Sequence, residues 1–177
     1  SAWAIQKDII ILYTNDVHCG IEDNLGYTKL AQYKEDLQQD TPYIALVDAG
    51  DAIQGAPIGK LSTGEAIINI MNEIGYDFAI PGNHEFDYRS KGLAKMLETA
   101  AESGDTVPEL LVCNINWDAM EQQGLSEGQQ QIRDAFTEYG TKDYVMVQKG
   151  DVRVALLGVF GKDALACAPT CELQFTD

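Results

Sequence analysis

The chain has 177 residues, of which 45% are hydrophobic, and this length suffices for one domain with its own core. Its 28 acidic and 12 basic residues give a formal net charge of −16. Such a surface repels polyanions, so we expect no binding to nucleic-acid polymers. The sequence contains no apolar run of about 18 residues, which predicts that it has no transmembrane segment.

Short apolar runs alternate with helical patterns along the first 115 residues. Continuous runs rich in β-branched residues predict buried strands, and apolar residues at helical spacing predict helices. This alternation predicts an α/β domain with a parallel sheet and helices on both sides of it. The predicted strands are 9–13, 43–47, 78–80 and 110–115, and the predicted helices are 27–37, 65–74 and 92–101.

The rest of the chain departs from this alternation. Residues 118–143 are rich in Gln, Glu and Gly with weak periodicity, so we expect an exposed, partly helical excursion. Two further strands are predicted at 144–148 and 152–160, joined by a turn, so that the core elements fall within residues 8–160. We expect residues 161–177 to form a cysteine-bearing loop.

The four cysteines form no CxxC or zinc-binding pattern. Cys167 and Cys171 are close enough in sequence to close a small disulfide loop in an oxidising compartment, and two free thiols are an equal alternative. We expect Cys19 and Cys113 only to pack as small apolar residues.

Polar residues follow each of the first three predicted strands. Asp16 and His18 follow the first, Asp51 follows the second, and Asn83 and His84 follow the third. The carboxyl ends of parallel strands share one rim, where ligands bind. Carboxylate, imidazole and amide oxygen suit Mn, Zn, Fe or Mg. We therefore predict a metal centre at which Asp51 can bridge two ions that clamp a phosphate and activate a water.

His84 fits the role of an acid better than that of a ligand, because it directly follows Asn83 and its side chain should point elsewhere. Asp87 lies three residues further on and can hold the ring as imidazolium, which stabilises phosphoryl oxygens and protonates a leaving alcohol. Two alternatives stay open. Asn83 can instead cap a helix that has Glu85 as a first-turn acid, and the rim can be purely structural. We assign Asp48 and Asp77 to solvated faces.

Three stretches carry a family resemblance: Tyr13-Thr14-Asn15-Asp16-Val17-His18, Gly50-Asp51-Ala52-Ile53-Gln54-Gly55 and Gly82-Asn83-His84-Glu85-Phe86-Asp87. They resemble the calcineurin-like metallophosphoesterases, and the chain is similar to the N-terminal domain of bacterial 5′-nucleotidases and 2′,3′-cyclic-nucleotide phosphodiesterases. The resemblance implies a four-layer αββα sandwich with two sheets and two divalent metal ions. It implies that Asp16 and His18 bind one metal, Asp51 bridges both, Asn83 binds the second, and His84 with Asp87 forms the catalytic dyad. Asn83 and His84 would also contact the substrate.

The implied function is hydrolysis of nucleotide phosphate esters by a hydroxide activated by two metals, with the 5′-nucleotidase and cyclic-phosphodiesterase types both open. A non-catalytic metal- or nucleotide-binding surface module is the alternative. The resemblance also implies export in bacteria, to an extracellular, cell-surface or periplasmic place that suits a disulfide between Cys167 and Cys171.

The end of the chain departs from the family pattern. The family completes its metal site with later histidines, in an Ala-x-x-His and a Gly-His-x-His stretch, whereas His84 is the last histidine here. We therefore expect residues 1–177 to be the N-terminal part of a catalytic domain that has little activity alone. Uncovered apolar sheet surface should then favour self-association.

Overall fold

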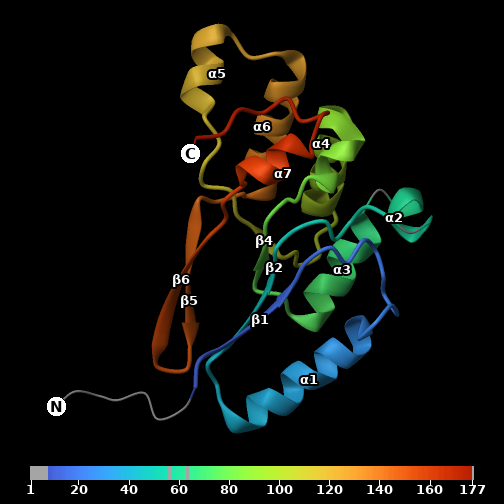
Figure 1. Ribbon diagram of the computed structural model, residues 1–177, viewed down its shortest axis with the longest axis vertical. Helices are drawn as coiled ribbons and strands as arrows, with labels where there is room; N and C mark the ends of the chain where they lie inside the picture. Colours follow the sequence, from blue (N-terminus) through green and yellow to red (C-terminus); the bar gives the residue numbers. More distant parts are fainter. Residues whose placement is uncertain (1–7, 56, 63, 177) are drawn as a thin grey trace, which may run out of the picture.

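The structure is a computed structural model that describes residues 8–55, 57–62 and 64–176 (Figure 1). Its centre is a parallel sheet, as the sequence predicts, and its four strands stand in the order β1-β2-β3-β4. The strands are β1 (Ile10–Thr14), β2 (Ile44–Asp48), β3 (Phe78–Ala79) and β4 (Glu109–Leu110). Because parallel strands that follow one another in order are joined by crossovers of one hand, their connecting helices fall on the same face.

That face is covered by α1 (Gly26–Asp40), α3 (Glu65–Ile74) and α4 (Arg89–Glu102), which line up beside the sheet in Figure 1. Leu46 of β2 is completely buried and shares a core with Ile67 of α3, which is equally inaccessible. The prediction of helices on both sides of the sheet is therefore wrong. The alternation of strands and helices along the chain predicts that the strands pair in parallel. The order of the strands within the sheet decides which face of the sheet the helices cover.

The opposite face carries an antiparallel hairpin of β5 (Tyr144–Lys149) and β6 (Val152–Leu157). Phe78, Leu111 and Val145 form a second, smaller core between this hairpin and the main sheet. The described residues thus make three layers: helices, a parallel sheet and a two-stranded second sheet (Figure 1).

The segment predicted as an exposed excursion forms α5 (Trp117–Gln123) and α6 (Glu127–Tyr139). Ser126 and Gln129 make a reciprocal capping box that starts α6. Ile132 and Ala135 on α6 have no exposed surface and belong to the main core, where α6 packs along α4. The predicted exposure was wrong, because a few apolar residues at helical spacing bury one side of a helix that is otherwise rich in Gln and Glu.

The last stretch also differs from the predicted loop. It contains the helix α7 (Lys162–Ala166), and Leu173 is buried in the main core. Phe175 forms a bridge with Ile115, so the end of the chain is tied back onto the fold. Cys167 and Cys171 carry free thiols, the second of the two alternatives. The other short helices are α2 (Pro57–Ser62) and the 3-10 helix η1 (His84–Tyr88).

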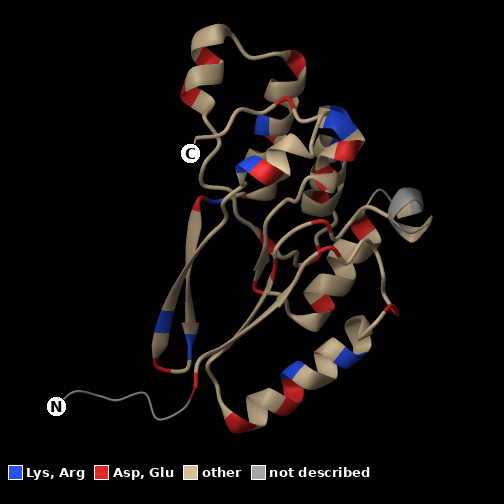
Figure 2. Ribbon diagram, in the orientation of Figure 1, with Lys and Arg blue, Asp and Glu red and all other residues tan. Residues whose placement is uncertain are grey.

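Acidic residues are spread over helices and loops, and the basic residues of the described part stand scattered among them (Figure 2). In the described part of the chain, no helix combines the length and the apolar character that crossing a bilayer would require.

Candidate metal centre

The loops that leave β1 and β2 are joined directly through their backbones. The N–H groups of Asp16 and His18 donate to the carbonyls of Gly50 (3.1 Å) and Asp51 (2.8 Å). Both loops start where their strands end, at the carboxyl rim of the sheet. The parallel pairing of β1 with β2 therefore continues into the loops and holds their polar side chains close together.

Three of the predicted site residues meet at this rim. The candidate ligand atoms of His18, Asp51 and His84 all lie within 4.8 Å of one another. The rings of His18 and His84 meet edge to face, with centroids 4.9 Å apart. Asp51 is buried, whereas the two imidazoles are partly exposed. Each residue comes from a different loop, so the cluster is a product of the tertiary fold.

Hydrogen bonds fix the tautomer of His18. Its Nδ1 lies 2.9 Å from the carbonyl oxygen of Gln54, and because a carbonyl can only accept, Nδ1 must carry the proton. The other nitrogen, Nε2, lies 3.6 Å from Oδ1 of Asp16. In the neutral ring, Nε2 carries the lone pair and lies beside this carboxylate, an arrangement that suits a shared cation.

His84 and Asp87 form the predicted pair. Nδ1 of His84 donates to Oδ2 of Asp87 at 2.7 Å, across one turn of η1. This hydrogen bond is the main cause that raises the pKa of His84 above its ordinary value, and the nearby Asp51 carboxylate adds to it. Since Asp87 engages Nδ1, Nε2 is the ring nitrogen left for the site.

The ligand loops adopt strained backbone. Asp16, His18 and Asp51 have φ angles of 55°, 50° and 60°, in the left-handed region that residues with a side chain seldom adopt. Such conformations cost roughly 1 kcal/mol or more each and gather at functional sites. Three of the four predicted ligands thus share an unfavourable conformation that the surrounding hydrogen bonds must maintain.

Asn83 directly precedes η1 and occupies its N-cap position, but its side chain makes no capping hydrogen bond. The alternative in which Asn83 serves as a side-chain cap is therefore not what the structure shows. Its role as a ligand of the second metal remains a prediction.

Two acids that the sequence analysis placed elsewhere lie directly beneath the rim. Glu85 is only 6% exposed, and its carboxylate accepts hydrogen bonds from the loops instead of facing solvent at a helix end. Asp48 is 3% exposed and accepts from the Thr14 hydroxyl at 2.7 Å. Burial raises the pKa of Asp48 to about 7. The assignment of Asp48 to a solvated face was wrong. The pattern of polar and apolar residues along a strand does not reveal which face of the sheet the helices cover.

Asp77, also assigned to a solvated face, is largely covered. It pairs with Lys149 of the hairpin and accepts a hydrogen bond from the backbone N–H of Leu46 at 2.9 Å. It ties the two sheets together away from the rim, and no sequence pattern near it signals that pairing.

The donor set fits a divalent metal. Ligand atoms on either side of one zinc-sized ion stand roughly 4 Å apart, so separations of up to 4.8 Å need only small side-chain adjustments. Imidazole and carboxylate groups are ligands that Zn, Mn and Fe accept. The acids Asp16, Asp51 and Asp87 and the net charge of −16 favour a cation at this rim.

The chain matches the calcineurin-like phosphoesterase family over residues 9–153. It is 33% identical to bovine 5′-nucleotidase over 100 residues, which cover 49% of this chain and 17% of that protein. It is 26% identical to the trifunctional nucleotide phosphoesterase YfkN of Bacillus subtilis over 183 residues, which cover 96% of this chain and 12% of that protein. The chain thus spans less than a fifth of the length of these two relatives.

Solved structures show the same fold. The crystal structure of the 5′-nucleotidase precursor from Thermus thermophilus superposes with a TM-score of 0.69 at 21% identity, over 94% of this chain and 31% of that one. The crystal structure of YfkN gives a TM-score of 0.60, also at 21% identity, over 94% of this chain and 53% of that one. The family match over residues 9–153 confirms the resemblance, and this chain belongs to the calcineurin-like phosphoesterases, which use divalent metals.

Proposed function

We propose that the catalytic domain to which residues 1–177 contribute hydrolyses phosphate esters of nucleotides, of the 5′-nucleotidase or the 2′,3′-cyclic-phosphodiesterase type. The observation that carries the proposal is the convergence of His18, Asp51 and His84, from three separate loops, within 4.8 Å. The printed names of the relatives, 5′-nucleotidase and nucleotide phosphoesterase, support a nucleotide as substrate.

Two divalent metal ions would be held by four residues: Asp16 and His18 for one ion, Asp51 between both, and Asn83 for the second. When bound, such ions polarise a phosphoryl oxygen and lower the pKa of a water, so that a nucleophile exists at neutral pH. The two oxygens of the Asp51 carboxylate suit the bridging role, and the Gln54 carbonyl keeps His18 in the tautomer that presents Nε2.

His84 would contact the phosphoryl group together with Asn83 and give its proton to the departing alcohol. Oδ2 of Asp87 accepts the Nδ1–H of His84 at an Nδ1–Oδ2 distance of 2.7 Å, which keeps the ring oriented with Nε2 toward the rim. The raised pKa of His84 favours the imidazolium form, the form that can donate a proton. We propose an extracellular, cell-surface or periplasmic setting for this reaction, as the family resemblance implies.

We propose further that residues 1–177 alone bind these ions weakly and turn over little substrate. Two ions of five or six ligands each need more donors than the four predicted ligands provide. The test is calorimetric titration with Mn²⁺ of the wild type and of Asp51→Ala, beside hydrolysis of p-nitrophenyl phosphate. Weak binding that Asp51→Ala abolishes, with little turnover, is the expected result.

Each other outcome has a definite meaning. Equal Mn²⁺ binding by the wild type and Asp51→Ala would refute the ligand assignment and leave a rim that is only structural. Hydrolysis at the rates of a complete nucleotidase would refute the expected inactivity. Strong Mn²⁺ binding without hydrolysis would favour a non-catalytic binding module.

A further inference from the structure

We propose that Glu85 is the positioning residue of the metal centre, which holds the Asp51 loop and the Gly82 loop in register with each other. Its carboxylate accepts hydrogen bonds from three backbone N–H groups: those of Asp51 (2.8 Å), Gly82 (2.6 Å) and Ile53 (3.2 Å). Two of these groups belong to the loop after β2, and the third belongs to the loop after β3. This inference rests on the metal-binding role proposed above.

The hydrogen bonds run between the loops that carry the ligands. Asp51 donates its own backbone N–H to Glu85, and Gly82 lies next to Asn83. The Asp51 carboxylate in turn accepts the backbone N–H of His84 at 2.7 Å. Glu85 therefore contacts the backbone of one predicted ligand and of the neighbour of another.

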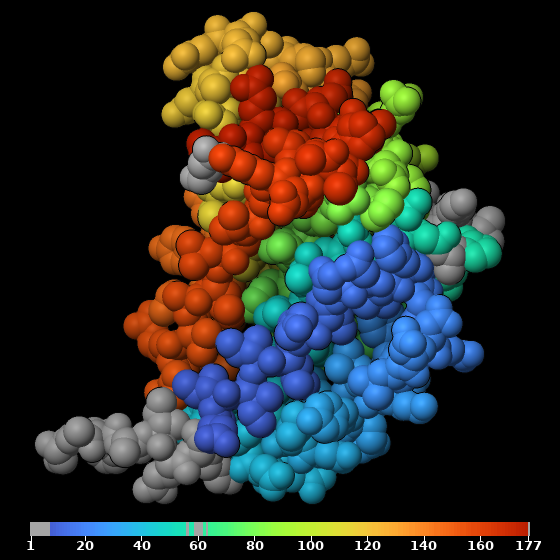
Figure 3. All heavy atoms as spheres, viewed as in Figure 1, coloured from blue at the N-terminus to red at the C-terminus, as the bar shows by residue number. Residues whose placement is uncertain are grey.

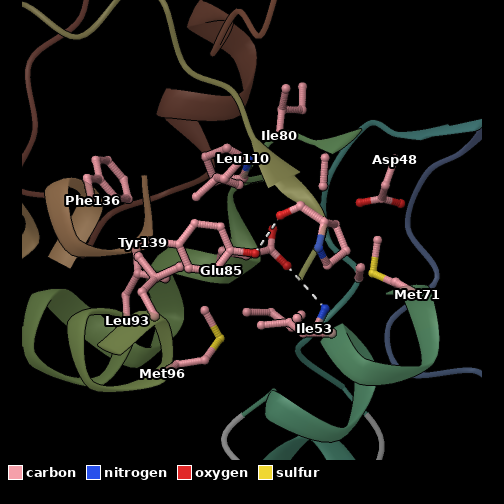
Figure 4. A pocket seen from close by; sticks show the side chains of 16 residues that line it. Asp48, Ile53, Met71, Ile80, Glu85, Leu93, Met96, Leu110, Phe136 and Tyr139 are labelled. Atoms are coloured by element: carbon pink, nitrogen blue, oxygen red, sulfur yellow. Dashed lines mark hydrogen bonds between the residues drawn. The ribbon is translucent and has the colours of Figure 1, made fainter. Parts of the chain in front are cut away.

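The surroundings of Glu85 make these hydrogen bonds strong. The residue is 6% exposed and lines a cavity of about 50 Å³ whose other walls are mainly apolar (Figure 4). Ile53, Leu93 and Met96 are among the side chains around it in that view. Among the described residues that line this cavity, Glu85 and Asp48 are the only charged ones. Water competes poorly for a carboxylate so placed, and hydrogen bonds to a charged acceptor are stronger than those to a neutral one.

A carboxylate is also the group that the geometry requires. Its two oxygens share three donors, Oε2 taking Asp51 and Gly82 and Oε1 taking Ile53. A glutamine has the same shape but turns one of those oxygens into an NH₂ group, which cannot accept a hydrogen bond. Glu85→Gln should therefore release at least one loop while it preserves the packing of the cavity wall.

The control is Asp77→Asn. Asp77 is also a largely covered carboxylate that accepts a backbone N–H, that of Leu46, but it lies before β3 and away from the rim. Replacing it should disturb the fold to a similar degree without changing the ligand loops.

The experiment measures amide hydrogen exchange and Mn²⁺ binding in the full 177-residue chain. We expect Glu85→Gln to speed exchange at Asp51, Ile53 and Gly82 at least tenfold, to leave Leu46 unchanged, and to weaken Mn²⁺ binding at least tenfold. Asp77→Asn should speed exchange at Leu46 and leave Mn²⁺ binding within twofold. If Glu85 had only a structural role, Glu85→Gln would instead speed amide exchange throughout the sheet.

The inference is overturned if Glu85→Gln leaves both the exchange of the three amides and the Mn²⁺ affinity within twofold of the wild type. It is also overturned if Glu85→Gln and Asp77→Asn weaken Mn²⁺ binding equally. If Glu85→Gln fails to fold, Glu85→Asp takes its place. This variant keeps the charge and shortens the side chain by one methylene, and it must speed amide exchange at Asp51, Ile53 and Gly82. If the wild type and Asp51→Ala bind Mn²⁺ equally, the proposed function fails, while the exchange data still decide the role of Glu85.

Discussion

Gly82 lies so close to Asp51 that a β-carbon at Gly82 would come within 2.3 Å of the Oδ1 atom of Asp51. The loop after β3 can therefore meet the loop after β2 only with glycine at this position. The contact brings the backbone N–H groups of Gly82 and Asp51 to the same carboxylate oxygen of Glu85.

Gly82→Ala should push Asp51 away from the other ligands. We expect the free energy of unfolding to fall by about 1–3 kcal/mol, as for other overpacked sites, and the affinity for Mn²⁺ to fall as well. Chemical denaturation and calorimetric titration measure the two effects. Gly161→Ala is the control, because a β-carbon there would meet no atom within 4 Å. Equal behaviour of the two variants would show that the close approach is unimportant.

Asp87→Asn should lower the pKa of His84. The hydrogen bond to Asp87 is the largest cause of the raised pKa, and an amide stabilises imidazolium less than a carboxylate does. The metal-free protein can be titrated by NMR through the imidazole C–H resonances. Because the chain has two histidines, His18→Asn assigns the signals. An unchanged His84 titration in Asp87→Asn would mean that the pair does not form in solution.

How much of this site the sequence could predict depends on the range of the interactions. The convergence of Asp16, His18 and Asp51 follows from a general rule of parallel sheets, since residues that follow the carboxyl ends of parallel strands share a rim. The role of Glu85 does not follow from any such rule. A glutamate early in a helical turn fits a solvated first-turn acid equally well, and only the tertiary fold shows that backbone groups of two loops surround it.

The same distinction holds for the fold. Apolar runs predicted the parallel strands, and β2 is buried on both faces as its run indicates. The predicted burial of the first strand was wrong, because β1 lies at the edge of the sheet and its Ile11 and Tyr13 are 51% and 73% exposed. The apolar runs could not show which face the helices cover, since that depends on strand order. Nor did the composition of α6 reveal its burial, because Ile132 and Ala135 are outnumbered by the polar residues around them.

Ile132→Ala tests whether α6 belongs to the core. Ile132 has no exposed surface in the contact between α6 and α4, and truncating a buried isoleucine to alanine typically costs about 2–5 kcal/mol. Urea unfolding followed by circular dichroism measures the loss. Glu138→Ala on the exposed side of the same helix should change stability by less than about 0.5 kcal/mol. A loss below that limit for Ile132→Ala would indicate that α6 is detached in solution.

Asp48 should make the protein less stable as the pH rises. Burial raises its pKa from 3.8 to about 7, so the folded protein holds the proton more tightly than the unfolded chain does. The stability from Asp48 is complete below pH 3.8 and is lost as the pH rises through about 7. Linkage gives a loss of about 3 kcal/mol in the free energy of unfolding between about pH 5 and about pH 8.

The matched variant for this effect is Asp48→Asn, which cannot titrate. Its free energy of unfolding should depend less steeply on pH over the same interval, whatever the absolute loss from the substitution. Urea titrations at several pH values compare the two slopes. Identical slopes would show that another group causes the pH dependence.

The outer edge of the parallel sheet should mediate self-association. Among the described strands, β1 pairs only with β2, and Ile11 and Tyr13 on it are 51% and 73% exposed. Figure 3 shows the N-terminal strand region open at the surface, between the hairpin and α1. An apolar edge strand is a template for pairing with a second copy. The net charge of −16 opposes this pairing, so association should strengthen as salt screens the repulsion.

Ile11→Lys places a charge on that edge and should shift the protein toward monomer, because a lysine must lose its hydration to enter a paired strand. Sedimentation velocity over a range of protein and salt concentrations measures the shift. Tyr33→Lys is the control, since Tyr33 is 50% exposed but lies on α1, away from the sheet. A wild type that stays monomeric at high concentration and high salt would refute the prediction. Equal weakening by both lysine variants would instead trace the association to net charge and not to the β1 edge.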